Sequence, residues 1–106
     1  MLSSEDKVIV DEFSRRVRER FSGARVWVFG SRARGNATWD SDFDICVVLQ
    51  KTSRSNYRKL RQIAWEIGFE NGVVITTVTY SRREFESGPR SASPLTRKIR
   101  LEGMAP

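Results

Sequence analysis

Apolar side chains recur every three to four positions in some segments of the chain and form short continuous runs in others, and these two patterns predict its elements. Over residues 4–21 they recur every four positions, which predicts an amphipathic helix with a stripe of Ile9, Phe13, Val17 and Phe21. A second helix is predicted over residues 55–69, with its inner stripe on Tyr57, Leu60, Ile63, Ala64 and Ile67. Short runs rich in β-branched and aromatic residues predict three strands, at residues 25–29, 43–49 and 73–80.

The C-terminal third predicts shorter helices. The spacing from Ser81 to Glu84 is that of a capping box, which starts a short helix directly after the third strand. A polar linker over residues 88–93 leads to a final helix over residues 93–103, with proline in its first turn and glycine at its end. This order of elements indicates one α/β (α+β) layered domain that comprises residues 1–106.

The amino-acid composition limits the kinds of partner and active site that the protein can have. The chain has 19 Lys and Arg residues against 13 Asp and Glu residues, a net charge of +6, which indicates an anionic partner or simply a soluble arginine-rich surface. It has no histidine and one cysteine, which excludes His-dependent triads, His-ligated zinc and internal disulfides. Cys46 lies in an apolar run and is expected to be a small buried hydrophobe. Without a bilayer-length apolar stretch or a signal-peptide pattern, we expect a soluble, cytoplasmic protein.

One group of residues in the sequence has the spacing of a ligand-binding or catalytic site. Gly30 and Ser31 end the first strand in a sharp turn, and ten residues separate them from Asp42-Phe43-Asp44. Because side chains alternate along a strand, Asp42 and Asp44 project to the same side, about 7 Å apart. Two carboxylates at the start of an apolar strand need a positive partner, and such oxygen ligands select Mg²⁺ or Mn²⁺. Either half of this pattern is common alone; together they predict a phosphate cradle beside a metal site.

The segment VWVFGSRARGNATWDSDFDICVVL resembles, through its whole length, the signature of the minimal nucleotidyltransferase family of the DNA polymerase β superfamily. That signature is a hydrophobic strand, Gly-Ser, about ten residues and Asp-x-Asp. The resemblance implies the polymerase β-like nucleotidyltransferase fold, a small mixed β-sheet flanked by helices. It also implies that Asp42 and Asp44 are the catalytic and metal-binding residues, and that Gly30 and Ser31 hold the β- and γ-phosphates.

The same resemblance implies a reaction and a partner. ATP would be the substrate, and AMP would pass to a hydroxyl of a partner protein while pyrophosphate leaves, with Mg²⁺ or Mn²⁺ as cofactor. Arg32 or Arg34 would add charge to the phosphate cradle, or else be surface residues. A chain this short resembles the antitoxin-type members, which are paired with an all-helical HEPN-type toxin; a homodimer is another way to complete the pocket. The final helix, residues 93–103, either packs on the core or docks on the partner.

The chain departs from the family pattern at the third strand. Family members carry a third carboxylate there, whereas residues 73–80 contain neither Asp nor Glu. Glu66, Glu70 and Glu84 flank this strand, but nothing in the sequence places them beside the Asp pair. The alternative hypothesis is therefore a catalytically degenerate nucleotidyltransferase fold that neutralises its partner by binding alone.

A third hypothesis, a small nucleic-acid-binding protein, rests on the net charge and the aromatic residues. We do not expect nucleic acid as the partner, because Trp27 and Trp65 fall within apolar elements and are expected in the core. No RRM, KH or helix-turn-helix signature is present either. Whether Thr38 and Trp39, in the loop before the Asp pair, touch a base or only pack stays open.

Overall fold

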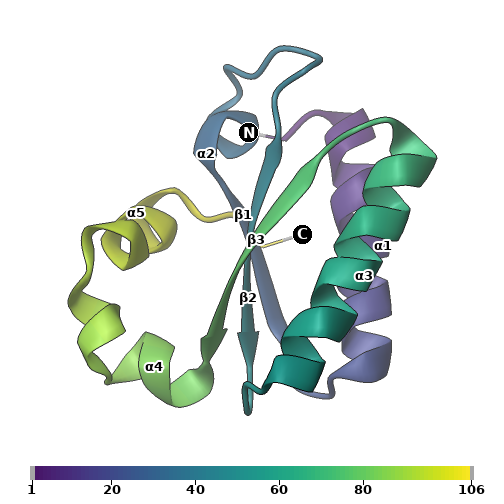
Figure 1. Ribbon diagram of the computed structural model, residues 1–106. Coiled ribbons are helices and arrows are strands. Elements are labelled where there is room, and N and C mark those ends of the chain that lie inside the picture. The colour runs from purple at the N-terminus through teal and green to yellow at the C-terminus, as the bar shows by residue number, and fades with distance from the viewer. Residues whose placement is uncertain (1, 106) are drawn as a thin grey trace.

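The computed structural model describes residues 2–105, and its elements follow the order that the sequence predicts (Figure 1). They are α1 (Ser4–Arg20), β1 (Arg25–Phe29), α2 (Gly30–Arg34), β2 (Phe43–Leu49), α3 (Arg54–Asn71), β3 (Ile75–Ser81), α4 (Arg82–Glu86), the 3-10 helix η1 (Pro89–Ala92) and α5 (Pro94–Glu102). The bounds predicted for the first two strands are confirmed. No helix among the described residues is both long and apolar enough to cross a membrane.

The differences from the predicted elements have local causes. β3 begins at Ile75 rather than two residues earlier, because the N–H of Val73 donates to the Gly68 carbonyl at 3.0 Å and so completes the end of α3. The segment predicted as a polar linker contains η1, which begins with proline in its first turn. The capping box at the start of α4 is present, with Ser81 and Glu84 each bonded to the other's backbone N–H.

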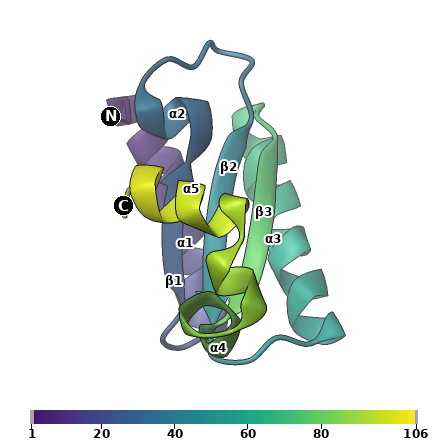
Figure 2. The ribbon, with the colours of Figure 1, turned by 90° about the vertical axis from the view of Figure 1, so that its left-hand side faces the viewer.

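The sheet has three strands in the order β1-β2-β3. β1 pairs with β2 antiparallel, and β2 pairs with β3 parallel through the crossover helix α3. Helices α1 and α3 cover one face, and α4 and α5 lie against the other (Figures 1 and 2). This small mixed sheet flanked by helices confirms the predicted fold class.

The larger core cluster fills the space between the sheet and the pair α1 and α3. Its β2 members are the odd-numbered residues, because alternate side chains point to opposite faces: Phe43, Ile45, Val47 and Leu49. On α1 the buried stripe comprises Val10, Phe13 and Val17, whereas Ile9 and Phe21 are only partly buried. The predicted stripe of α1 is therefore correct at its centre and shifted at its ends.

The smaller cluster lies on the opposite face, under α4 and α5, and comprises Phe29, Cys46, Val48, Tyr80, Phe85 and Ile99. The burial expected for Cys46 is confirmed, and this burial raises the pKa of its thiol to about 12. Ile99 packs α5 onto this cluster, which confirms core packing for that side chain. Leu95 and Leu101, on the same helix, remain exposed.

The aromatic residues that the sequence places in apolar elements differ in burial. Trp27 is half-buried and stacks on Phe85, with ring centroids 5.2 Å apart. The prediction that Trp65 belongs to the core is wrong, because 63% of this residue is exposed. Tyr57, predicted on the inner stripe of α3, is also exposed. Both exposed rings lie on the side of α3 that extends past β3, where the sheet has no further strand to cover them.

Candidate functional site

Gly30 joins β1 to α2 directly, so that the chain turns from strand to helix within one residue. Its φ is +77°, a backbone conformation that residues other than glycine rarely adopt. A Cβ at this position would overlap the Oδ2 atom of Asp44. The turn therefore brings the backbone of Gly30 into direct contact with the carboxylate of Asp44, as the Gly-Ser and Asp-x-Asp spacing suggests.

Asp44 lies near the start of β2, where it faces Phe29 of β1 on one side and Thr76 of β3 on the other. It is half-buried, and its Oδ1 atom accepts a hydrogen bond of 2.9 Å from the Thr76 hydroxyl. This bond fixes one carboxylate oxygen, whereas Oδ2 faces Gly30. The carboxylate is thus oriented toward the Gly-Ser turn before any ligand is present.

Asp42 precedes β2 by one residue and is exposed. Strand alternation continued back from Asp44 places it on the same face of the sheet. The nearby carboxylate of Asp40 is held differently, because it accepts a hydrogen bond from the Thr38 hydroxyl within the loop. Of the loop carboxylates, Asp42 is the one without a hydrogen bond or ion pair to another described residue.

Ser31 is the second residue of α2, and its carbonyl accepts from the N–H groups of Gly35 and Asn36 at 3.0 and 3.2 Å. These bonds close the turn with Gly35 in the left-handed conformation. The Ser31 hydroxyl makes no hydrogen bond to another residue in the described range 2–105. It is available to a ligand that approaches Asp44 from the Gly-Ser turn.

Arg32 does not face that ligand position. Its side chain is buried and pairs with Asp6 of α1 at 2.8 Å. It also donates to the Ser41 carbonyl at 3.0 Å and lies 4.2 Å from the ring centroid of Phe43. These contacts connect α1, α2 and the start of β2, so Arg32 fixes the loop that carries the Asp pair. The positive charge of Arg32, expected in the phosphate cradle, is therefore paired with Asp6 inside the fold.

Arg34 pairs with a residue that the sequence interpretation missed. Its guanidinium lies 3.1 Å from an oxygen of Glu102, at the end of α5. The same carboxylate accepts from the Gly30 N–H at 3.2 Å, so the C-terminal helix contacts the Gly-Ser turn. One sequence signal pointed to this contact: an acidic side chain in the last turn of a helix is disfavoured by the helix dipole and indicates a partner elsewhere.

The third carboxylate of the family pattern is absent from β3, where Thr76 stands beside Asp44. Glu66 and Glu70 pair with Arg16 of α1, and Glu84 caps α4 and pairs with Arg90. The hydrogen bond that the Ser81 backbone N–H donates to its carboxylate holds the pKa of Glu84 below its usual value. Among the described residues, no group of three or more Cys, Asp or Glu side chains could hold a metal ion. The strands therefore offer the two Asp carboxylates to a ligand, and Glu102 is a further carboxylate at the Gly30 turn.

Comparison with known proteins identifies the family and the fold of the chain. The sequence profile of the family described as "Nucleotidyltransferase domain" matches residues 10–104. The fold is similar to a crystal structure of a toxin–antitoxin with AMP-PNP, at TM-score 0.65 and 20% identity over 90% of this chain and 69% of that one. It is also similar to a structure described as a minimal nucleotidyltransferase, at TM-score 0.57 and 25% identity over 94% and 87%. No protein of curated function matched the sequence.

Proposed function

The chain belongs to the nucleotidyltransferase domain family, and on that premise we propose that it transfers AMP from ATP to a hydroxyl of a partner protein. The observation that supports this proposal is the contact between Gly30 and the Asp44 carboxylate, which makes one site of the turn and the acidic strand. The structural similarity to a toxin–antitoxin complex supports a protein as the partner. We propose that this partner is a HEPN-type toxin, with a second copy of the chain as the other candidate.

Divalent metal is the cofactor that this donor set fits. Asp42 is exposed and unpaired within the described residues, and Asp44 directs one oxygen toward the turn, so both carboxylates can hold Mg²⁺ or Mn²⁺. When bound, the ion neutralises the charge of the triphosphate. Gly30 and Ser31 would hold the β- and γ-phosphates through backbone N–H groups and the Ser31 hydroxyl, once Glu102 releases the Gly30 N–H. Arg34 is the exposed arginine of the motif and can add positive charge once Glu102 releases it.

The reaction would be an in-line displacement at the α-phosphorus. The acceptor oxygen forms a new bond to phosphorus and loses its proton, while the bond to the oxygen that bridges the α- and β-phosphates breaks and pyrophosphate leaves. The chain's own residues bind and orient the nucleotide for this attack. The further carboxylate at the turn, Glu102, is paired with Arg34 and bonded to the Gly30 N–H, so the partner or solvent would receive the proton.

A second function is favoured by the absence of an acidic residue from β3, where Thr76 stands beside Asp44. Under this alternative the chain is a degenerate nucleotidyltransferase fold that neutralises a partner by binding alone. The two functions differ in what the Asp pair does: the enzyme requires both carboxylates, whereas the binding protein neutralises its partner without them.

Calorimetric titration with ATP, with and without Mg²⁺, tests the proposed site. We expect Mg²⁺-dependent binding that the double variant Asp42→Asn/Asp44→Asn loses. Asp40→Asn is the matched control, because Asp40 lies in the same loop and is bonded to Thr38. Unchanged binding by the double variant would contradict the assigned site.

Transfer is tested with ATP labelled at the α-phosphate and the co-purified partner. The label should appear on the partner with the wild-type chain and with Asp40→Asn, and not with Asp44→Asn. Full neutralisation of the partner by the double variant, without labelling, would favour the binding-only alternative.

A further inference from the structure

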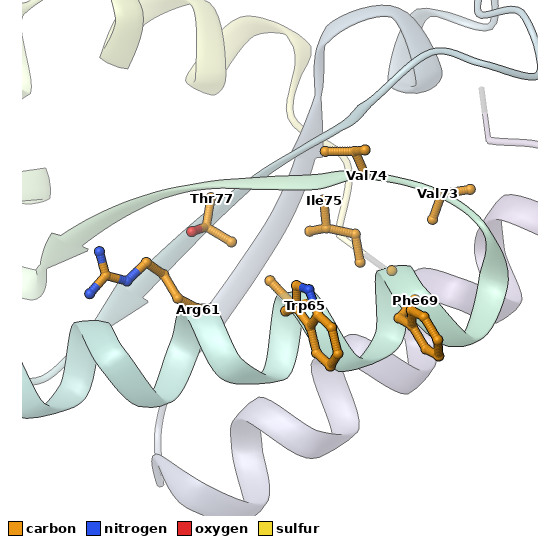
Figure 3. A pocket seen from close by; sticks show the side chains of 9 residues that line it. Arg61, Trp65, Phe69, Val73, Val74, Ile75 and Thr77 are labelled. Carbon is orange, nitrogen blue, oxygen red and sulfur yellow. The ribbon is translucent and has the colours of Figure 1, made fainter.

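A hollow of about 540 Å³ lies between α3 and β3, away from the Asp pair, and it is lined mainly by apolar side chains (Figure 3). Trp65 and Phe69 border it from α3 and are 63% and 75% exposed. Their rings stack on each other with centroids 5.3 Å apart, and Val74 and Ile75 line the β3 side. Two neighbouring, largely exposed aromatic rings beside aliphatic side chains form a patch of the kind that binds a partner.

The hollow borders an open edge of the sheet. β3 pairs with β2 alone among the described strands. The N–H of Phe43 donates to the Val74 carbonyl, and in a parallel ladder this register directs the backbone groups of Ile75 and Thr77 away from β2. The outward Thr79 carbonyl fits this orientation, because it accepts a hydrogen bond from Arg90. Ile75 and Thr77 therefore offer backbone donors and acceptors beside the apolar hollow.

Charge changes along this edge. Arg61 lines the apolar hollow and also a second hollow of about 370 Å³, which Tyr57, Thr79 and Arg90 share. Among residues 2–105, no acidic side chain lines either hollow. The two glutamates of this part of α3, Glu66 and Glu70, pair with Arg16 on the α1 side instead. Arg61 has no ion pair with another residue that the structure describes. The edge is thus apolar at one end and positive at the other.

We propose that an extended segment of a partner protein adds beside β3 as a fourth strand, with apolar side chains in the hollow and carboxylates at the Arg61 end. Strand addition supplies main-chain hydrogen bonds, and the two hollows supply side-chain specificity. Charge complementarity requires the acidic end, because Arg61 has no partner within residues 2–105. A second copy of the chain would present the same arginine and no lining carboxylate. Because the Trp65 and Phe69 rings already stack on each other, they favour contact with an apolar side chain over stacking on a nucleic-acid base.

This inference goes beyond the proposed nucleotide chemistry and does not depend on it. Ile75 packs against the core cluster on the α1 and α3 face, whereas Cys46, two residues after Asp44 on β2, belongs to the opposite cluster. Strand alternation therefore places the Asp44 carboxylate on the face away from the hollow. Substitutions in the hollow should leave Mg²⁺-dependent ATP binding unchanged, and their effect is separable from a failure of the nucleotide site.

The test uses fluorescein-labelled dodecapeptides and fluorescence anisotropy. In the first peptide Val and Thr alternate over the first half, and Glu and Thr alternate over the second half. The second peptide has these two halves in reverse order. Two control peptides repeat both orders with Lys in place of Glu. One order of the Glu peptide should bind more tightly than its Lys counterpart. Trp65→Ala should weaken this binding about tenfold or more, while Leu101→Ala, a truncation of an exposed side chain on α5, should not change it.

Two further variants test the strand geometry and the charge. Thr77→Pro removes an outward N–H without breaking the ladder to β2, so it should abolish peptide binding while the unfolding midpoint stays close to that of the wild type. Arg61→Glu should reverse the preference, so that the Lys peptide binds better than the Glu peptide.

Four outcomes would overturn the proposal. The first is that neither order of the Glu peptide binds better than its Lys counterpart, and the second is that binding persists unchanged in both Trp65→Ala and Thr77→Pro. Tight binding of a labelled oligouridine in place of the peptides would assign the surface to nucleic acid. Self-association in sedimentation velocity, lost in Thr77→Pro, would assign the edge to a second copy.

Discussion

The two faces of the sheet differ in composition although they share the same three strands. The face toward α1 and α3 is closed by the larger cluster, in which aliphatic side chains of both helices meet the odd residues of β2. The face toward α4 and α5 has fewer apolar residues and carries Asp44 near the start of β2. Arginines lie over its aromatic rings, with Arg90 4.0 Å from the Tyr80 centroid and Arg100 4.4 Å from the Phe85 centroid.

This difference shows how the short strand β2 contributes to both the core and the candidate site. Because side chains of β2 alternate, Ile45 can contribute to a closed apolar core while its neighbour Asp44 stays accessible to a ligand. The stability of the fold resides mainly in one face, which allows the other face to keep a carboxylate beside the Gly30 backbone. Substitutions on the two faces should therefore separate stability from nucleotide binding.

The largest effect on stability is expected from Ile45→Ala. Ile45 is fully buried in the larger cluster, and its truncation leaves a cavity that should lower the free energy of unfolding by about 3 kcal/mol. Urea denaturation measures this change. Asp44→Asn, one residue away on the opposite face, should change stability far less and abolish Mg²⁺-dependent ATP binding. Equal stability losses in the two variants would contradict the division between the faces.

Gly30→Ala is expected to have a smaller effect on stability and a large effect on the site. The φ of +77° and the overlap with Asp44 should cost about 2 kcal/mol and move the carboxylate away from the turn. Gly72→Ala is the matched control, since Gly72 also has a positive φ but nothing lies within 4 Å of an added Cβ. It should cost about 1 kcal/mol and leave ATP binding intact. Normal ATP binding by Gly30→Ala would remove the proposed role of the close contact.

Glu102→Gln tests the link between the C-terminal helix and the Gly-Ser turn. The substitution removes a negative charge beside Gly30 and releases Arg34, both of which favour a bound triphosphate. We expect ATP to bind about threefold more tightly, with the effect reduced at high ionic strength. Weaker binding by this variant would show that the carboxylate positions the turn for the nucleotide rather than competing with it.

The smallest expected effect lies on the surface of α1, outside both faces. Hydrogen bonds from Arg15 and Arg16 lower the pKa of Glu12 to about 2 from the ordinary value of 4.5. A folded-state pKa below the unfolded value stabilises the fold at pH above about 4.5, and this contribution is lost as the pH falls through about 2. Glu12→Gln should reduce the slope of stability against pH in this range. An unchanged slope, measured by thermal unfolding at low salt, would contradict the assignment.

The strands and the junction of the site were predictable because their signals are local. β1 and β2 are short apolar runs with clear ends, and the spacing from Gly30 to Asp44 required only that the two strands be neighbours. The burial of Arg32 was not predictable in this way. Its partner, Asp6, is 26 residues away, and its position depends on how α1 packs against the loop.

Two other features depend in large part on the tertiary fold. Trp65 lies in an apolar segment but off the buried stripe of α3, and the sequence does not state how many strands the sheet has. With β3 at the edge, the ring extends beyond the sheet and stays exposed. The contact of Glu102 with Gly30 likewise spans 72 positions and requires α5 to cross β1 (Figure 2).

Cys46, the single cysteine of the chain, acts as a built-in reporter of opening. Only the thiolate reacts with maleimides and disulfide reagents, and a fully buried thiol with a pKa of about 12 is unreactive at neutral pH. Its labelling would therefore count the molecules whose central strand has become exposed, so the labelling rate follows the opening of the sheet. By the same argument, a thiol introduced by Leu101→Cys would be labelled alone, and α5 could carry a probe without removal of the natural cysteine.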